Sequence, residues 1–170
     1  MRTIAKKVCL LGDFSVGKTS LVRRFVYNRF EDRYISTIGV KVSRKTVAVP
    51  TNPQVIELTM MLWDLAGSEE FDRMRGSYLQ GAAGAVLVCD LTRTETLNSL
   101  SQYAQDLLRA NPGARIVLAA NKNDLSDQHQ VTPDQVAEVA ATFKSPYYLT
   151  SAKTGDKVEM LFRTLGQMLI

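Results

Sequence analysis

The sequence predicts a single α/β domain built on a mainly parallel β-sheet with helices on both of its faces. Apolar runs of strand length alternate along the chain with segments of helical periodicity. Helices placed between strands imply crossover connections, which join parallel strands and cover both faces of a sheet. The 170 residues are enough for one substantial core, and no linker, repeat or low-complexity tract divides them.

Six segments have the length and apolar character of β-strands. In one of them Ile56, Leu58, Met60 and Leu62 alternate with polar or mixed residues, which is typical of a strand with one buried face and suggests a place at the sheet edge. The sequence Pro50-Thr51-Asn52-Pro53 lies between two of the segments and predicts a hairpin turn, hence one antiparallel pair. In chain order, the expected strands are residues 6–11, 40–49, 56–64, 85–90, 115–120 and 147–150.

Five segments have helical periodicity, and two of them also carry end signals. Apolar side chains recur at helical spacing after residue 94, and Asn111-Pro112-Gly113 stops that pattern. The sequence Thr132-Pro133-Asp134-Gln135 predicts a capping box with proline at the first helical position. The expected helices are residues 18–27, 71–79, 94–110, 133–143 and 157–169.

Composition and charge limit the classes of function. Hydrophobic residues make up 45% of the chain, which is ordinary for a folded globular domain. The net charge of +4 permits an anionic ligand, but no basic run indicates a nucleic acid partner. Cys9 and Cys89 lie in apolar strand-like runs, so we expect buried free thiols and a reducing, cytoplasmic setting.

The stretch GDFSVGKT at Gly12–Thr19 is the most informative segment of the chain. It follows an apolar strand-like run and opens a helical pattern, which is the context of a phosphate-binding P-loop. Its glycines let backbone N–H groups surround phosphate oxygens, and the helix N-terminus favours the same anion. Lys18 can reach the β- and γ-phosphates, and the Thr19 hydroxyl can ligate Mg²⁺. The expected nucleotide-binding residues here are Gly12, Asp13, Phe14, Ser15, Val16, Gly17, Lys18, Thr19 and Ser20.

Two further motifs supply groups that suit a metal and a γ-phosphate. In Ser36-Thr37-Ile38-Gly39, the Thr37 hydroxyl can ligate Mg²⁺ while its backbone N–H meets the γ-phosphate. In Asp64-Leu65-Ala66-Gly67, at the end of an apolar strand, Asp64 can hold Mg²⁺ through water. Gly67 can bring its N–H close to the γ-phosphate because no side chain intervenes.

Two motifs near the end of the chain suit a guanine base. Asn121-Lys122-Asn123-Asp124 follows an apolar strand, and the Asp124 carboxylate can accept together from the ring N–H and the exocyclic amine of guanine. Adenine lacks that pair of donors, so Asp124 should discriminate between the two bases. Ser151-Ala152-Lys153 follows a short strand, and a backbone N–H there can reach the guanine oxygen.

Together these motifs resemble the Ras superfamily of small GTPases, and most closely its Rab branch. The resemblance rests on the sequences GDFSVGKTS, STIG, WDLAGSE, NKND and SAK, and it covers nearly the whole chain. It implies a six-stranded mixed sheet, mostly parallel with one antiparallel edge strand, flanked by five helices, with GTP or GDP and Mg²⁺ as ligands. By position, Phe30 matches the aromatic residue that stacks on guanine, and Tyr34 matches the tyrosine that covers the phosphates.

The resemblance also implies where partners bind. Arg29–Val40 and Ala66–Tyr78 match the two switch segments, where an effector, an exchange factor and an activating protein would bind. Trp63 and Tyr78 match two of three aromatic residues that Rab proteins present to partners, and the third position holds Val42. No cysteine ends the chain, so we expect no prenyl anchor in it. We also expect a monomer, and a cytoplasmic location that allows peripheral contact with a membrane.

Two residues depart from the family pattern. Ser68 stands where the family usually has the glutamine that orients the attacking water, and its side chain is too short to reach the same place. Phe14 stands beside the γ-phosphate, where many members have a small residue. The residues expected to carry catalysis are Lys18, Thr37, Gly67 and Ser68.

Three functions fit these motifs to different degrees. The first is a GTP-dependent switch that hydrolyses GTP slowly because Ser68 cannot position water. The alternative is a guanine-nucleotide-binding module with negligible hydrolysis that acts as a constitutively loaded scaffold. An ATP-using P-loop kinase is opposed by Asn121–Asp124 and by the lack of a lid-like insertion.

Overall fold

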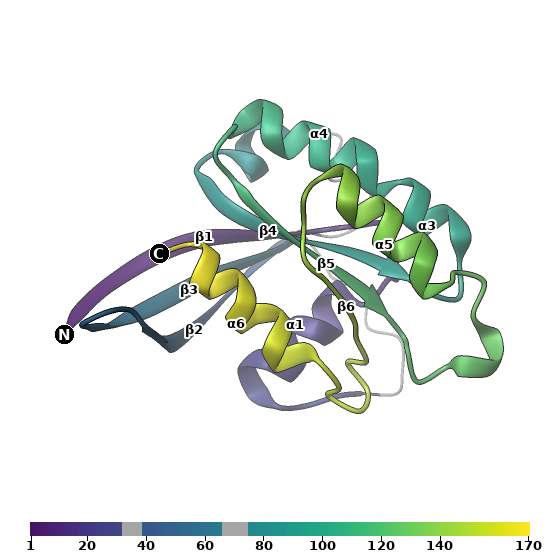
Figure 1. Cartoon of the computed structure of the whole chain (residues 1–170), viewed down its shortest axis with the longest axis horizontal. Helices are drawn as coiled ribbons and strands as arrows, with labels where there is room; N and C mark the ends of the chain where they lie inside the picture. The colour runs from purple at the N-terminus through teal and green to yellow at the C-terminus, as the bar shows by residue number, and fades with distance from the viewer. Residues whose placement is uncertain (32–38, 66–74) are drawn as a thin grey trace.

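The computed structural model describes residues 1–31, 39–65 and 75–170 and contains a six-stranded mixed sheet (Figure 1). The strand order across the sheet is β2-β3-β1-β4-β5-β6. Strand β2 pairs antiparallel with β3 at one edge, and the other pairs are parallel, so the predicted sheet is confirmed. The strands are β1 (Arg2–Leu11), β2 (Val40–Pro50), β3 (Val55–Leu65), β4 (Ala82–Asp90), β5 (Arg115–Asn121) and β6 (Tyr147–Leu149).

Helices cover both faces of the sheet. Within the described ranges they are α1 (Lys18–Tyr27), α3 (Thr94–Asn98), α4 (Leu100–Ala110), α5 (Pro133–Thr142) and α6 (Val158–Met168), with a short 3₁₀ helix η1 (Ser126–Gln128). The capping box at the start of α5 is confirmed, because Thr132 and Gln135 exchange side-chain and backbone hydrogen bonds. Residues 75–79 are helical, and the rest of the helix predicted at 71–79 lies outside the described residues.

The single helix predicted at 94–110 is divided at Ser99 into α3 and α4. The Ser99 hydroxyl donates to the backbone oxygen of Glu95 at 2.9 Å and to the Asp13 carboxylate at 2.7 Å. A hydroxyl that competes for backbone groups inside a helix weakens the regular ladder. The interruption therefore coincides with a contact that joins this helix to the loop after β1.

The core consists of two apolar clusters, one on each face of the sheet. Alternate residues of each central strand belong to different clusters, as the period of two in a β-strand requires. Leu87 and Leu118 pack beneath α3, α4 and α5, whereas Val86 and Val117 pack beneath α1 and α6. Figure 1 shows these two helical layers on opposite sides of the strands.

Strand β3 corrects one expectation about the sheet. Its alternating pattern is confirmed, because every second residue from Ile56 to Leu62 is buried. The predicted position at the sheet edge was wrong, because β3 pairs with β2 on one side and β1 on the other. Its second face is only half-buried, which gives an internal strand the alternation of an edge strand. The predicted turn joins β2 to β3, and the Thr51 N–H and hydroxyl both donate to the Gln54 carbonyl.

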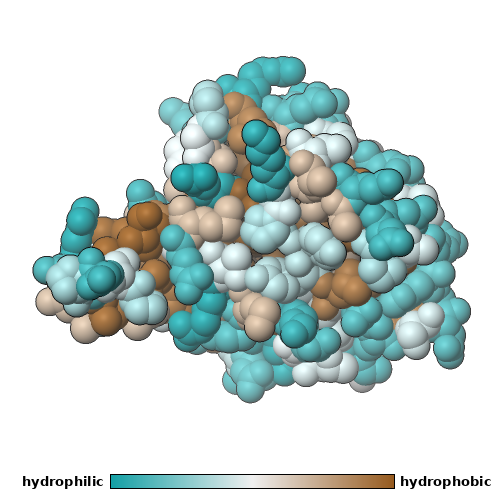
Figure 2. Space-filling view, in the orientation of Figure 1, coloured by the Kyte–Doolittle hydropathy of each residue, from teal (hydrophilic) through white to brown (hydrophobic). Residues whose placement is uncertain are grey.

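The two chain ends lie at the same end of the molecule as the β2–β3 hairpin (Figure 1). Figure 2 shows a largely hydrophilic face, with apolar side chains gathered toward that end. The exposed apolar residues Met1, Val55 and Ile170 belong to the segments there. None of the helices in the described ranges is long and apolar enough to cross a membrane. The carboxyl ends of β1, β4 and β5, and the polar loops that follow them, lie away from this end of the molecule.

Candidate functional site

The predicted site residues come together where the central parallel strands end. The P-loop follows β1, Asp64 lies near the end of β3, and Asn121 is the last residue of β5. Because β3, β1, β4 and β5 are neighbours and parallel, their carboxyl ends lie together at one end of the sheet. Open α/β sheets bind ligands at the carboxyl ends of their strands.

Two glycines of the P-loop are required by close approach. A Cβ atom on Gly12 would lie 2.3 Å from the backbone oxygen of Val88 in β4, which leaves no room for a side chain. A Cβ atom on Gly17 would lie 2.2 Å from Nδ2 of Asn121, and its φ of 104° is also unfavourable for other residues. The loop therefore packs directly onto β4 and β5.

Lys18 folds back over the start of the P-loop. Its Nζ donates to the backbone oxygens of Gly12 at 2.8 Å and of Asp13 at 3.1 Å. Burial lowers the pKa of the Lys18 ammonium, and the carboxylates of Asp64 and Asp13 oppose that shift. A buried cation with two acidic neighbours is suited to hold a multiply charged phosphate group.

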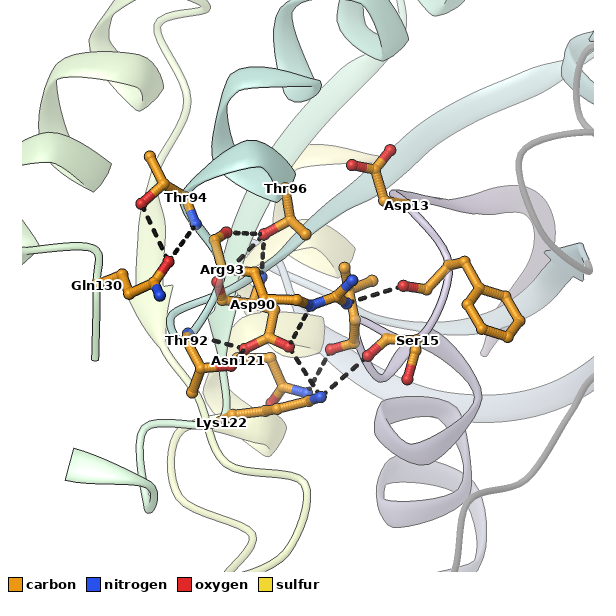
Figure 3. Close-up of polar contacts among 12 residues, drawn as sticks. Asp13, Ser15, Asp90, Thr92, Arg93, Thr94, Thr96, Asn121, Lys122 and Gln130 are labelled. Carbon is orange, nitrogen blue, oxygen red and sulfur yellow. Dashed lines mark hydrogen bonds and ion pairs between the residues drawn. The ribbon is translucent and has the colours of Figure 1, made fainter. Parts of the chain in front are cut away.

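Three further side chains donate to the next three carbonyls of the loop (Figure 3). They are Arg93 Nη2 to Phe14 at 2.8 Å, Lys122 Nζ to Ser15 at 3.0 Å and Asn121 Nδ2 to Val16 at 3.0 Å. With the two bonds from Lys18, five successive carbonyls from residue 12 to residue 16 each accept from a side chain. Across a trans peptide, the following N–H points the opposite way. The N–H groups of the loop are therefore left to face an anion.

Thr19 and Asp64 offer a pair of oxygen ligands beside Lys18. The Thr19 hydroxyl donates to the Asp64 carboxylate, and Asp64 is 2% exposed. Mg²⁺ in nucleotide sites is usually held by one or two protein oxygens together with phosphates and water. No group of three or more His, Cys, Asp and Glu residues in the described ranges forms a metal site of its own. The pair fits a Mg²⁺ ion that arrives with phosphate, and Thr37 lies outside the described residues.

The base-recognition motifs are joined to each other by side-chain hydrogen bonds. The Ser151 hydroxyl donates to Asp124 at 2.7 Å and holds one oxygen of that exposed carboxylate. The Asn121 Oδ1 atom accepts from the Thr150 hydroxyl at 3.1 Å and from the Ala152 N–H at 3.3 Å. Asn121 thus acts between the P-loop and the loop after β6, as a positioning residue for both.

Arg24 supports the loop after β6 and is not marked by any of the sequence motifs. It lies in α1, where its Nε donates to the Ala152 carbonyl at 2.8 Å and its Nη2 donates to the Lys153 carbonyl at 2.5 Å. Its Nη1 also donates to Asn28 at 3.0 Å, at the end of the same helix. In the sequence it is one of several basic residues in an amphipathic helix, and nothing there marks it as the one that reaches a loop 128 residues away.

The structure refines the expectations for three predicted residues. The Asp13 carboxylate accepts hydrogen bonds from the Ser99 hydroxyl at 2.7 Å and from the Tyr103 hydroxyl at 3.1 Å, so the structure gives it partners outside the P-loop. Phe14 is 53% exposed, so its ring lies at the surface beside the loop. Phe30 is half-buried and packs against the cluster that α1 and α6 cover.

The remaining expectations concern the partner segments and catalysis. Tyr78 was expected to be a surface aromatic, but it is 1% exposed and its hydroxyl donates to the Leu10 carbonyl at 3.1 Å. Val42, which holds the third position of the aromatic set, is exposed. The Lys7 ammonium lies 3.8 Å from the centre of the half-buried Trp63 ring. Four predicted site residues lie outside the described residues, namely Tyr34, Thr37, Gly67 and Ser68.

Comparisons with known proteins agree with the motifs and the fold. The family model of the Ras family matches residues 7–170. The GTP-binding protein ypt4 of Schizosaccharomyces pombe is 34% identical, with 96% of this chain and 71% of that protein covered. The Ras-related protein SEC4 of Saccharomyces cerevisiae is 36% identical, with coverage of 96% and 74%. The Ras-related protein Rab-27B of Bos taurus is 34% identical, with coverage of 96% and 79%. Because both the family model and these relatives span nearly all of the chain, it belongs to the Ras family, as a Rab-like small GTPase.

Proposed function

We propose that this chain is a GTP-binding switch whose nucleotide lies at the carboxyl ends of the parallel strands. The observation that carries the proposal is the set of five successive P-loop carbonyls, each held by a side-chain donor. That arrangement supports diphosphate binding by the loop N–H groups, with Lys18 adding charge. Asp124, held by Ser151, would select guanine, because one carboxylate accepts from both donors on the guanine edge.

Mg²⁺ would be held in this site by Thr19 and Asp64, with Thr37 as a further ligand. When bound, the ion supplies positive charge to the phosphate oxygens. Thr19 and Asp64 already share a hydrogen bond, so their oxygens lie close enough to act on one ion, directly or through water. The Lys18 ammonium, which donates to the Gly12 and Asp13 carbonyls, would add a second positive charge to the phosphates.

Hydrolysis of GTP by this site is proposed to be slow. Phosphoryl transfer depends mainly on positioning and electrostatic stabilisation, and Ser68 lacks the length to orient the attacking water. Binding should be unaffected, because the contacts that support it come from the P-loop, Asp124 and Lys18. The same serine favours the second candidate function, a guanine-nucleotide-binding module with negligible hydrolysis.

Single-turnover hydrolysis separates these two functions. The protein is loaded with GTP, free nucleotide is removed, and the released phosphate is followed over time. A slow but measurable rate that increases in Ser68→Gln supports the switch and assigns the slow rate to Ser68. A rate equal to that of free GTP, in protein that stays loaded and folded, supports the binding module. If wild type already hydrolyses as fast as Ser68→Gln, the proposed role of Ser68 is wrong.

Partner binding is proposed to follow the nucleotide state through Arg29–Val40 and Ala66–Tyr78. Thr37 and Gly67 in these segments can offer N–H groups to a γ-phosphate, and loss of that phosphate would release both segments. Hydrogen exchange should be slower there with a non-hydrolysable GTP analogue than with GDP. Equal exchange in the two states would contradict a switch. The cytoplasmic location and the monomeric state stay predictions from the sequence.

A further inference from the structure

Asp90, the last residue of β4, is a buried carboxylate that the sequence motifs did not assign. Its side chain is 1% exposed, and both of its oxygens accept two contacts. Oδ1 accepts from the backbone N–H of Thr92 at 2.8 Å and from its hydroxyl at 2.7 Å. Oδ2 lies 3.1 Å from Arg93 Nε and 2.8 Å from Lys122 Nζ (Figure 3).

The environment keeps this carboxylate charged. Burial alone would raise the pKa of Asp90, but the hydrogen bonds from Lys122 and Thr92 outweigh it and hold the pKa below its ordinary value of 3.8. Asp90 is therefore an anion at neutral pH, paired with two cations. A buried charge that is fully hydrogen-bonded in this way fixes the geometry of its partners.

Each of the two cations makes a second contact, and both of these are with the P-loop. Arg93 Nη2 donates to the Phe14 carbonyl at 2.8 Å, and Lys122 Nζ donates to the Ser15 carbonyl at 3.0 Å. One carboxylate thus anchors the donors for two successive carbonyls of the loop. Lys122 belongs to the base-recognition motif, whereas Arg93 lies in the turn between β4 and α3.

We propose that Asp90 and Arg93 are positioning residues for phosphate binding. They hold the carbonyls of Phe14 and Ser15 outward, so that the N–H groups that follow face the diphosphate of the nucleotide. Neither residue is assigned a contact with the nucleotide, and both act through the backbone of the loop. The inference rests on the proposed nucleotide site and adds a support that comes from outside its motifs.

The Arg93 side chain can be removed without dismantling the turn that carries it. The Arg93 backbone N–H donates to the Asp90 carbonyl at 3.0 Å, and the Thr96 hydroxyl donates to the Arg93 carbonyl at 2.7 Å. The same hydroxyl accepts from the Asp90 N–H at 2.8 Å. These bonds use the backbone and Thr96, so they remain when the guanidinium is lost. The Arg93 side chain is also 34% exposed, which leaves room for substitution.

The test compares Arg93→Met with the matched control Arg163→Met. Arg163 also pairs with an acidic residue on its own segment, at 2.7 Å from Glu159, but it is half exposed and lies in α6. The release of fluorescent GDP and the affinities for GDP and inosine diphosphate are measured, together with the melting temperature. Inosine lacks the exocyclic amine of guanine but keeps its ring N–H and oxygen, so the ratio of the two affinities reports on the contact between that amine and Asp124.

We expect Arg93→Met to release GDP about tenfold faster than wild type, because one charge-assisted hydrogen bond to the loop is lost. The ratio of GDP to inosine diphosphate affinity should not change, and Arg163→Met should behave as wild type. Asp90→Asn should release GDP at least as fast as Arg93→Met, since both cations lose their anchor. A lower melting temperature alone, with an unchanged release rate, would mean a purely structural role and would overturn the inference.

Other outcomes are equally decisive. If wild type binds GDP and Arg93→Met releases it at the same rate, the inference fails and the proposed site stands. If wild type binds no guanine nucleotide, the proposed site fails and the inference fails with it. A fall in the GDP to inosine diphosphate ratio would place the effect at the base and overturn the assignment to the phosphates. If Arg93→Met does not fold, Arg93→Lys is measured in its place. Lysine keeps the charge but cannot contact both Asp90 and the Phe14 carbonyl as the guanidinium does, so the inference again requires faster GDP release.

Discussion

Asn121→Ala is the substitution whose effect follows most directly from the structure. The Asn121 side chain is 2% exposed and makes three hydrogen bonds, with the Val16 carbonyl at 3.0 Å, the Thr150 hydroxyl at 3.1 Å and the Ala152 N–H at 3.3 Å. Alanine leaves all three partners buried and without that bond. This single substitution should therefore loosen both the P-loop and the loop after β6.

The magnitude follows from the three buried partners. Each buried polar group left without its hydrogen bond costs about 1–3 kcal/mol, and the longest of the three bonds counts least. A total of about 4 kcal/mol is a large part of the ~5–15 kcal/mol by which a domain is stable. For a chain of this length the melting temperature should fall by about 8–16 °C. GDP affinity should also fall by more than about tenfold, because both loops that hold the nucleotide lose their common support.

The assay is thermal and urea unfolding of nucleotide-free protein, followed by a GDP titration under conditions where each variant is folded. Asn98→Ala, at an exposed position in α3, is the matched control. Thr150→Val removes one of the three bonds and should cost about 1 kcal/mol in wild type but much less in Asn121→Ala. A melting temperature within about 3 °C of wild type, or strictly additive costs in the double variant, would refute the reasoning.

Three further outcomes are expected. Asp124→Asn should weaken GTP binding by about 10²-fold or more, since two charged hydrogen bonds are lost, and should improve xanthosine triphosphate binding; unchanged GTP affinity in a titration would contradict the assignment. Arg24→Met should lower the affinities for GDP and inosine diphosphate by the same factor, because it frees the Ala152 and Lys153 carbonyls in the loop assigned to the oxygen that both bases carry; unchanged affinities, or a change confined to GDP, would argue against this. Burial raises the pKa of the Cys9 and Cys89 thiols to about 12, so iodoacetamide at pH 8 should label neither in the native state and both after unfolding, as intact mass would show.

The fold could be predicted from the sequence because its main determinants are local. Period-two and period-3.6 patterns mark strands and helices, and a helix between two strands requires a parallel pair. The position of β3 could not be derived in this way, because its half-buried second face has the same pattern as an edge strand. Similarly, the break at Ser99 coincides with a contact with Asp13, 86 residues earlier, which no local pattern records.

The candidate site likewise contains residues that local sequence patterns mark and residues that only distant contacts reveal. Groups that would touch the nucleotide belong to compact motifs, so the sequence marks residues such as Lys18, Asp64 and Asp124, whose roles stay predictions. The side chains that orient those motifs come from elsewhere, as Arg24 does from α1 and Arg93 from the turn after β4. Their hydrogen bonds end on backbone carbonyls, and a carbonyl carries no sequence signature. Positioning residues of this kind can be recognised only when the fold brings them to the loop.

This division explains why Phe14 and Ser68, the two departures from the family pattern, have different consequences. The hydrogen bond that holds residue 14 in the P-loop uses its backbone carbonyl, which accepts from Arg93 at 2.8 Å, and not its side chain. The phenyl ring is 53% exposed, so we expect it to leave the orientation of the loop unchanged. Ser68 is proposed to differ because the family glutamine acts through its side chain, which a shorter side chain cannot replace. On the proposed function, nucleotide binding and hydrolysis would depend on separate parts of this chain, and Ser68→Gln should change the rate of hydrolysis without changing the affinity for GTP.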